Sequence, residues 1–232
     1  MTETLVFAIP SKGRLMDRTL AVLEQAELYL QRFGSSRGYR GEIKGLENLE
    51  VAFMSAGEIA SALRSGRAHL GVTGEDLMRE EVSAPEACVE FVTKLGFGHA
   101  DVVVAVPKCW LDVRRMRDLG EAAIQFRRLH GRRIRVATKY MNLTRGYFTR
   151  HAISDYRLVE SLGATEGTPA AGTAEAIVDI TSTGATLTAN GLKILADGVI
   201  LKSQANLIAS RTARWDPETR AAQNQLFARL QL

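Results

Sequence analysis

Four hydroxyl side chains and a glycine directly follow a short apolar run near residue 180. The run covers residues 176–180 and is mostly β-branched and apolar, with Asp179 as its one charged residue. Such a run predicts a buried strand of a parallel sheet, with Asp179 near its C-terminal end. The residues after the strand are Thr181, Ser182, Thr183, Gly184, Ala185 and Thr186, and a helix is expected to begin near residue 187.

This arrangement of residue types favours an anion beside a diol. Backbone N–H groups at a turn and helix start converge on a phosphate, and hydroxyl side chains add neutral donors. An ionised carboxylate only accepts hydrogen bonds, so Asp179 suits ribose hydroxyls or a magnesium shell better than phosphate oxygens. The segment therefore predicts a binding site for a ribose 5-phosphate group.

A second loop with suitable chemistry lies near the N-terminus. Lys12, Gly13 and Arg14 place a glycine between two cations where a helix is expected to start. N–H groups and positive charge together favour an anionic ligand there, although an ordinary turn with surface cations has the same pattern. A third loop, 71–77, has two glycines and two carboxylates, and helix capping explains its Asp76 equally well.

The fourth loop combines a cation with an aromatic ring. Lys139 and Tyr140 end a predicted strand, and Arg145 follows five residues later. A ring that stacks on a base and cations that meet phosphates would make a nucleotide contact. Packing of Tyr140 and surface exposure of Lys139 would explain the same residues without a ligand.

Each of these loops connects a predicted strand to a predicted helix. This alternation is typical of an α/β fold with mostly parallel sheets. Ser11 is predicted to cap the first helix, and Asp216 to cap the last, with Pro217 in its first turn. The predicted strands are 5–9, 50–54, 69–72 and 134–137, and the predicted helices are 12–33, 56–63, 75–79 and 140–150.

The chain is expected to form two lobes that share a cleft. No proline-rich linker or internal repeat is visible, so strands must carry the chain between lobes; 101–106 and 199–210 suit this role. One lobe would then comprise 1–100 with 208–232, and the other, with the phosphate loop, 101–207. Ligands of open α/β sheets bind at the carboxyl ends of strands, which would direct loops of both lobes into the cleft.

Composition narrows the class of protein. A net charge of +4 and a pI near 9.2 suit a protein that handles polyanions. Two basic stretches occur, at 114–117 and 127–133. They lack stacking aromatics, and the acidic residues Asp112, Asp118 and Glu121 are interleaved with them. We therefore interpret these stretches as a solvated helical face and not as a nucleic-acid site. The two cysteines and four histidines show no metal-site spacing. With no basic leader and no apolar run of membrane-spanning length, a soluble cytoplasmic protein is expected.

Two common nucleotide-binding classes are excluded by their missing motifs. No G-x-x-x-x-G-K-[ST] sequence occurs, which removes kinase-type NTPases from consideration. The glycines at 96–98 lack the third glycine and the helix of a dinucleotide loop, which removes Rossmann dehydrogenases.

In their order along the chain, the four loops resemble those of a known family. The chain is similar to the catalytic subunit of ATP phosphoribosyltransferase, in its short form, over nearly its full length. The residues that resemble the family are 10–15, 71–77, 137–140 and the stretch from 160–166 to 190–192. The last stretch is the most specific of the four.

The resemblance implies a two-lobed fold like type II periplasmic binding proteins, and a reaction with magnesium present. N1 of the adenine of ATP would displace pyrophosphate from C1 of phosphoribosyl pyrophosphate, the first step of histidine biosynthesis. Residues 181–186 would hold the donor's 5-phosphate, with Asp179 near its ribose hydroxyls. Lys12 and Arg14, with Gly13 between them, would face pyrophosphate or triphosphate. The adenine and ribose side would be lined by Asp76, Lys139, Tyr140 and Glu166.

The resemblance also implies partners. After the last crossing strand about 20 residues remain, too few for the histidine-binding domain of the long form. Short forms are regulated by a catalytically inactive relative of histidyl-tRNA synthetase, so we expect such a subunit around a homodimeric core.

Two positions depart from the family pattern. Many family members have a basic residue where Met54 stands and a proline where Met141 stands. Because Met54 is uncharged, the cation near the pyrophosphate is expected elsewhere, at Arg37 or Arg40.

Two other functions stay open at this point. A non-catalytic two-lobed anion-binding module would use the same architecture. Asp179 argues against it, because a carboxylate beside a dianion weakens anion binding. A nucleotide-salvage phosphoribosyltransferase would have adjacent acids in its loop, whereas here Ile180 follows Asp179.

Overall fold

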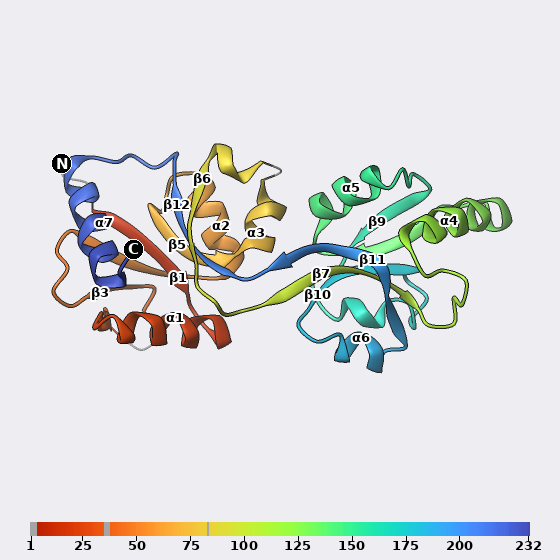
Figure 1. The fold of residues 1–232 in the computed structure, drawn as a ribbon, viewed down its shortest axis with the longest axis horizontal. Coiled ribbons are helices and arrows are strands. Elements are labelled where there is room, and N and C mark those ends of the chain that lie inside the picture. Colours follow the sequence, from red (N-terminus) through yellow and green to blue (C-terminus); the bar gives the residue numbers. More distant parts are fainter. Residues whose placement is uncertain (1–3, 35–37, 83) are drawn as a thin grey trace. The chain divides into compact units, whose positions relative to one another are not determined.

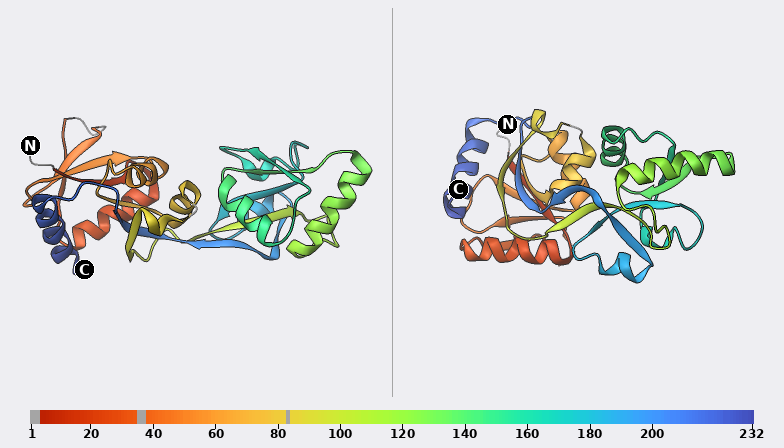
Figure 2. Two further views of the ribbon diagram at one scale, coloured as in Figure 1. Left: turned by 90° about the horizontal axis from the view of Figure 1, so that it is seen from above. Right: turned by 45° about the vertical axis from the view of Figure 1, so that its right-hand side comes forward.

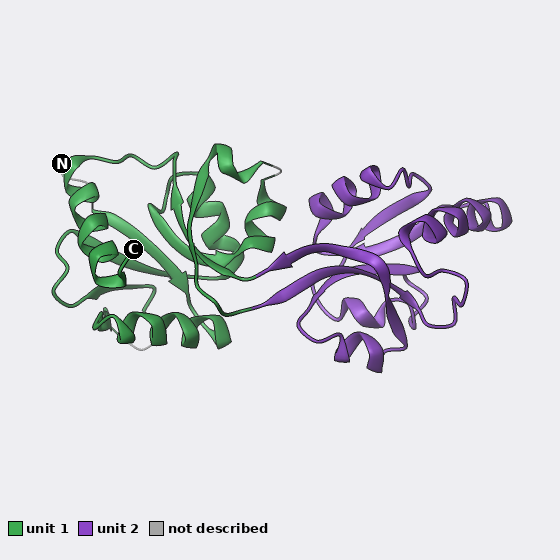
Figure 3. Cartoon of the chain, in the orientation of Figure 1, with its two compact units in different colours: residues 1–98, 204–232 green, residues 99–203 purple. Residues whose placement is uncertain are grey.

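The computed structural model describes residues 4–34, 38–82 and 84–232 (Figure 1). They divide into two compact units, Met1–Gly98 with Gln204–Leu232, and His99–Ser203 (Figure 3). The chain therefore passes between units at 98/99 and 203/204, close to the expected borders after residues 100 and 207. Within the described ranges every helix is too short or too polar to cross a membrane.

Unit 1 is built on a seven-stranded sheet in the order β2-β3-β4-β1-β5-β12-β6. Strands β4, β1 and β5 are parallel, and the outer strands are antiparallel to their neighbours. The strands are β1 Leu5–Pro10, β2 Leu30–Arg32, β3 Arg40–Ile43, β4 Leu49–Met54, β5 Leu70–Gly74, β6 Val89–Lys94 and β12 Ala205–Ser210. The α-helices are α1 Gly13–Gln25, α2 Ala56–Arg64, α3 Glu75–Glu81 and α7 Pro217–Leu230.

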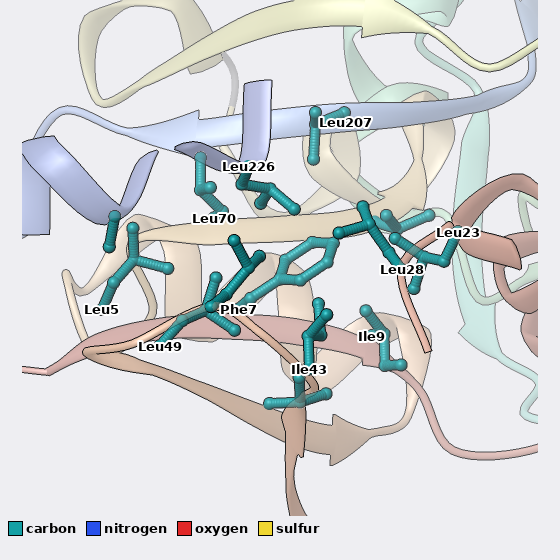
Figure 4. Packing of buried hydrophobic residues seen from close by; sticks show 14 of the residues in the cluster. Leu5, Phe7, Ile9, Leu23, Leu28, Ile43, Leu49, Leu70, Leu207 and Leu226 are labelled. Atoms are coloured by element: carbon teal, nitrogen blue, oxygen red, sulfur yellow. The ribbon is translucent and has the colours of Figure 1, made fainter. Parts of the chain in front are cut away.

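Alternation along β1 directs side chains to both faces of this sheet. Leu5, Phe7 and Ile9 point to one face, where they pack with residues of α1 and α7 (Figure 4). Ala8 points to the other face, which α2 and α3 cover (Figure 2). Full burial of a leucine or phenylalanine side chain contributes about 1.5–3 kcal/mol, so these two layers account for much of the stability of unit 1.

Two predictions about the first helix are wrong. The helix ends at Gln25, and the chain turns through Glu27 (φ 57°) into β2, whereas the prediction continued it to residue 33. Strand β2 exists because it pairs with β3, a partner that local periodicity does not reveal. Ser11 is not the cap, since its N–H donates to the Met54 carbonyl (2.8 Å) and Lys12 takes the N-cap position. The predicted Asp216 cap is confirmed, because its carboxylate accepts the Thr219 N–H at 2.9 Å.

Unit 2 contains a five-stranded sheet in the order β11-β7-β10-β8-β9. Strands β10, β8 and β9 are parallel, while β7 is antiparallel to both β10 and β11. The strands are β7 Ala100–Pro107, β8 Ile134–Thr138, β9 Tyr156–Glu160, β10 Ala176–Thr181 and β11 Leu192–Ser203. The α-helices are α4 Met116–His130, α5 Met141–Arg150 and α6 Ala185–Ala189. The predicted strand 199–210 is divided between β11 and β12 at Gln204.

The basic stretches of unit 2 serve as the predicted solvated face. Arg117, Arg127 and Arg128 are exposed along α4, and Arg117 pairs with Glu121 one turn later. A second set of arginines is structural, since Arg132 and Arg135 both bind Glu175 just before β10.

Glu175 anchors the start of β10. Its carboxylate accepts from the Arg135 guanidinium and backbone N–H, both at 2.7 Å, and from Arg132 at 3.0 Å. Burial alone would raise the pKa of this carboxyl, but these hydrogen bonds outweigh it and lower the pKa to about 2. Because its pKa is lowered on folding, ionised Glu175 stabilises the folded state. This contribution is fully present above the unfolded-state pKa, near 4.5, and is lost as the pH falls toward 2.

Glu175→Gln is therefore expected to lower the free energy of unfolding at pH 7 by about 1–3 kcal/mol. The difference from wild type should shrink as the pH falls from 5 toward 2–3, measured by denaturant unfolding. Glu121→Gln is the matched control, because its ion pair with Arg117 is exposed and worth about 0.5 kcal/mol or less. An equal loss in both variants, or one that does not change with pH, would contradict this role.

Candidate functional site

The parallel strands of unit 2 bring three sequence segments to one edge of the sheet. Val178 in β10 lies beside Thr138 in β8, which lies beside Glu160 in β9. The residues that follow these positions therefore leave the sheet at the same end. This register places Asp179 and Lys139 at one edge, as expected for loops at the carboxyl ends of parallel strands.

Asp179 is half-buried at this edge. Its carboxylate accepts the N–H of Ile180 at 2.8 Å. Burial raises the pKa of Asp179. The hydrogen bond from the Ile180 N–H and the positive charge of Lys139 oppose this rise, whereas the negative charge of Glu166 adds to it. The predicted residues Asp179, Lys139 and Glu166 thus lie within electrostatic range of one another. Carboxylates whose pKa is shifted by burial and neighbouring charges cluster at functional sites, so Asp179 is a candidate functional residue.

The hydroxyl segment forms a compact turn after β10. The Gly184 N–H donates to Thr181 Oγ1 (2.8 Å) and the Ala185 N–H to Thr183 Oγ1 (3.3 Å). Gly184 has φ +73°, a left-handed conformation that favours glycine. Leu187 is buried and anchors α6, whereas Ser182 and Thr186 are exposed. The turn therefore presents hydroxyls to solvent from a rigid base.

The ring of Tyr140 does not face a ligand, which corrects one expectation. Tyr140 is 0% exposed, and its N–H donates to Thr138 Oγ1 at 2.8 Å. A ring with no accessible surface cannot stack on a base, so it acts in packing. Lys139 is exposed, with its Nζ 5.0 Å from the Tyr140 ring centroid, and remains available to an anion.

The remaining predicted residues belong to unit 1. Lys12, Gly13 and Arg14 are exposed after β1, whose last residue, Pro10, pairs with Met54. Gly13 has φ +78°, so the turn requires a glycine. Asp76 is 6% exposed in the first turn of α3, where the helix dipole favours a negative charge; Gly74, not Asp76, takes the N-cap position, and no side chain among the described residues caps this helix. The predicted ATP-binding set is therefore divided between the two units.

The structure also bears on the cation expected to compensate for Met54. Arg40 forms an ion pair with Glu50, and Arg37 lies outside the described residues. Arg32 reaches this strand end, with its guanidinium carbon 3.6 Å from the centroid of the Phe53 ring. Arg32 is not recognisable from the sequence, because residues 12–33 have the pattern of one helix. No local signal marks it, since its position depends on strand β2.

Magnesium would have to be bound with help from the substrate. Among the described residues, no three side chains of histidine, cysteine, aspartate or glutamate form a cluster. Magnesium at nucleotide sites is bound through one or two carboxylates together with phosphate oxygens. Asp179, with Glu166 near it, fits that donor set.

Comparison with known proteins identifies the family. The family model for HisG, ATP phosphoribosyltransferase, matches residues 55–232. The ATP phosphoribosyltransferase of Bradyrhizobium diazoefficiens is 59% identical over 220 residues, which are 95% of this chain and 68% of that protein. The chain belongs to the ATP phosphoribosyltransferase family. The predicted activity, a transferase acting in the first step of histidine biosynthesis, is confirmed.

The curated ATP phosphoribosyltransferases are longer than this chain. The enzyme of Bradyrhizobium sp. (strain ORS 278) is 61% identical over 215 residues, 93% of this chain and 66% of that protein. The chain thus spans about two thirds of their length. Since these matches cover more than nine-tenths of this chain, they extend well into the residues that precede position 55.

Solved structures confirm the predicted fold class. A chain described as belonging to the ATP phosphoribosyl transferase (HisG:HisZ) complex from Thermotoga maritima has a TM-score of 0.74 and 25% identity. The match covers 98% of this chain and 96% of that chain. The chain also resembles the alkanesulfonate-binding protein SsuA from Xanthomonas axonopodis, with a TM-score of 0.51 and 18% identity. That match covers 99% of this chain and 73% of the SsuA chain, and it shows the fold alone. The ATP phosphoribosyltransferase family thus shares the two-sheet α/β fold of type II periplasmic binding proteins.

Proposed function

We propose that Asp179 and the turn at 181–186 bind the phosphoribosyl donor, and that N1 of ATP attacks its C1. The observation that supports this proposal is the position of Asp179 near the end of β10, ahead of a turn that exposes the hydroxyls of Ser182 and Thr186, with Lys139 within electrostatic range. The turn would hold the 5-phosphate through N–H and hydroxyl donors. Asp179 would accept hydrogen bonds from the ribose hydroxyls.

The reaction requires alignment and charge stabilisation more than covalent chemistry. Adenine N1 is a weak neutral nucleophile, and C1 gains positive charge as its bond to pyrophosphate breaks. A fixed carboxylate at Asp179 would stabilise that developing positive charge. Its partial burial strengthens this interaction, because fewer waters compete for the carboxylate. No single nucleophilic side chain is needed.

The exposed cations would serve the phosphates. Lys12 and Arg14 after β1 would meet the pyrophosphate or the triphosphate, and Lys139 after β8 would face ATP. Asp179 and substrate phosphate oxygens would hold Mg²⁺, which when bound neutralises charge on the leaving group. Glu166 is proposed to line the ATP side.

A regulatory partner is also proposed. The Thermotoga maritima chain matches this one over nearly its full length and is described as part of a complex with HisZ. We infer that this chain acts as a short-form catalytic subunit, a homodimer bound by a histidyl-tRNA-synthetase-like regulator.

A pyrophosphate-release assay tests the proposed reaction. The purified chain is expected to release pyrophosphate from phosphoribosyl pyrophosphate when ATP and Mg²⁺ are supplied, in the presence and absence of a HisZ-type subunit. Guanine, hypoxanthine and orotate are the alternative acceptors. Release with one of them and not with ATP would instead identify a salvage enzyme.

A further inference from the structure

We infer that Thr165 is a positioning residue that fixes the carboxylate of Glu166 at the edge of unit 2 where β10 ends. The inference rests on the proposed function, in which Glu166 lines the ATP side of the site. Thr165 begins a single 3₁₀ turn, Thr165–Gly167, in the connection from β9 to β10. This turn packs against β10.

The side chain of Thr165 is buried and hydrogen-bonded. It is 3% exposed, and its Oγ1 donates to Ser161 Oγ at 3.0 Å. Ser161 is in turn fixed to strand β8, because its N–H donates to the Thr138 carbonyl at 3.0 Å. Thr138 is the last residue of β8 and directly precedes Lys139. The hydroxyl of Thr165 therefore connects the 3₁₀ turn to the strand edge of the candidate site.

Further hydrogen bonds fix the other end of the turn. The Thr165 carbonyl accepts the Thr168 N–H at 3.1 Å and Thr168 Oγ1 at 2.8 Å. The Thr168 carbonyl accepts the Thr173 N–H at 3.0 Å and Thr173 Oγ1 at 3.1 Å, shortly before β10 begins. Glu166 thus lies between two fixed points of the connection.

Local conformational preference does not favour this turn. Ala164, directly before it, has φ +49°, a left-handed conformation that is unfavourable for residues other than glycine. The hydrogen bond between Thr165 and Ser161 counteracts this preference. Without the hydroxyl, Ser161 loses a partner and the turn is expected to open more often.

Glu166 is suited to bind a ligand. It is half-buried, and among the described residues its carboxylate forms no ion pair. An ionised carboxylate only accepts hydrogen bonds, so it suits the amino group and ribose hydroxyls of a nucleoside. Hydrogen bonds weaken steeply with poor distance and angle, so the position of this carboxylate decides how well it binds.

Two measurements on the full chain test the inference. Amide hydrogen exchange without ligand reports how often the turn opens, and calorimetry with ATP and Mg²⁺ gives a dissociation constant without turnover. Thr165→Val and Ser161→Ala each remove one side of the hydroxyl pair, whereas Thr165→Ser keeps it. Glu166→Gln is measured alone and together with Thr165→Val. Thr219→Val is the matched control, because it removes a buried threonine hydroxyl from the last helix of unit 1.

The hydrogen-exchange rates of the Gly167 and Thr168 amides are expected to rise about 10-fold in Thr165→Val and in Ser161→Ala, through local opening of the turn. Thr165→Ser and Thr219→Val should stay within about 2-fold of wild type at these amides. Exchange that is unchanged in every folded variant lacking the hydroxyl pair overturns the inference.

The dissociation constant of ATP is expected to rise about 5-fold in Thr165→Val and about 10-fold in Glu166→Gln. In the double variant, Thr165→Val should add less than about 2-fold, because it acts through Glu166. A full additional 5-fold loss there, or an equal loss in Thr165→Ser, overturns the inference. If exchange accelerates as expected while Glu166→Gln binds ATP like wild type, the positioning of Glu166 is supported and its proposed place on the ATP side is wrong.

Discussion

Asp179→Asn is expected to lower kcat by about 100-fold or more while the protein remains at least as stable as wild type. The loss in rate follows from removing a fixed negative charge beside the carbon that becomes positive. The Ile180 N–H bond, 2.8 Å in the wild type, can still be made to the asparagine carbonyl oxygen, so the strand end keeps its geometry. Steady-state kinetics and thermal unfolding measure the two effects.

The stability expectation follows from the direction of the pKa shift. Burial raises the pKa of Asp179, so the native state binds a proton more tightly than the unfolded state does. Such a group stabilises the fold below its unfolded pKa, and this contribution is lost as the pH rises through the folded pKa. At pH 7 the ionised carboxylate is a net cost, which an amide does not carry.

The same shift predicts the pH dependence of the rate. If ionised Asp179 is required, kcat/KM should fall on the acidic side, with the fall shifted to higher pH than the ordinary pKa of an aspartate would give. Asp112→Asn is the control, since Asp112 is an exposed aspartate of the same unit away from this strand edge. A variant Asp179→Asn with near-wild-type kcat, or one that is clearly destabilised at pH 7, would contradict the assignment.

Gly184→Ala is expected to raise the KM for phosphoribosyl pyrophosphate about 10-fold. The added Cβ would meet Ile194 Cδ1 at 3.6 Å, an ordinary contact, so the change acts through the backbone, where φ is +73°. An alanine there costs about 1–2 kcal/mol in the left-handed conformation and shifts the turn toward another one. The N–H groups and hydroxyls would then no longer converge on the 5-phosphate; a tenfold change corresponds to about 1.4 kcal/mol.

Gly191→Ala provides the matched control for this variant. Gly191 follows the other end of α6, has φ +71° and has no atom within 4 Å of an added Cβ. Both variants should lose similar stability, with Tm lower by about 2–4 °C per kcal/mol. Only Gly184→Ala should raise the KM. Equal kinetic effects in the two variants would show that the turn at 181–186 does not bind the donor.

The strand and turn that carry the candidate site in unit 2 could be predicted from sequence because their signals are local. The apolar run that forms β10 and the hydroxyls after it are contiguous, so strand, turn and Asp179 follow from residue types alone. The Asp216 cap and the start of α2 at Ala56 were predictable for the same reason. The α/β class followed from the repeated alternation of strands and helices.

Other features depended on partners distant in sequence. Strand β2 is stabilised by β3, and without that pairing residues 12–33 have the pattern of one helix. The burial of Tyr140 could not be predicted either, because an aromatic residue after a strand suits stacking and packing equally. In both cases the deciding contact is made by residues that local periodicity does not describe.

The sequence by itself determined the residue types that can bind phosphate and ribose, and their order along the chain. Only the tertiary structure decided which of them share an edge. The parallel register of β10 with β8 places Asp179 near Lys139, although 39 residues separate them. Burial raises the pKa of Asp179, and the charge of Lys139 opposes that rise. Likewise Arg32 reaches Phe53 because β2 and β4 belong to one sheet. Charge and hydrogen bonding act through space, so strand pairing decides which groups interact.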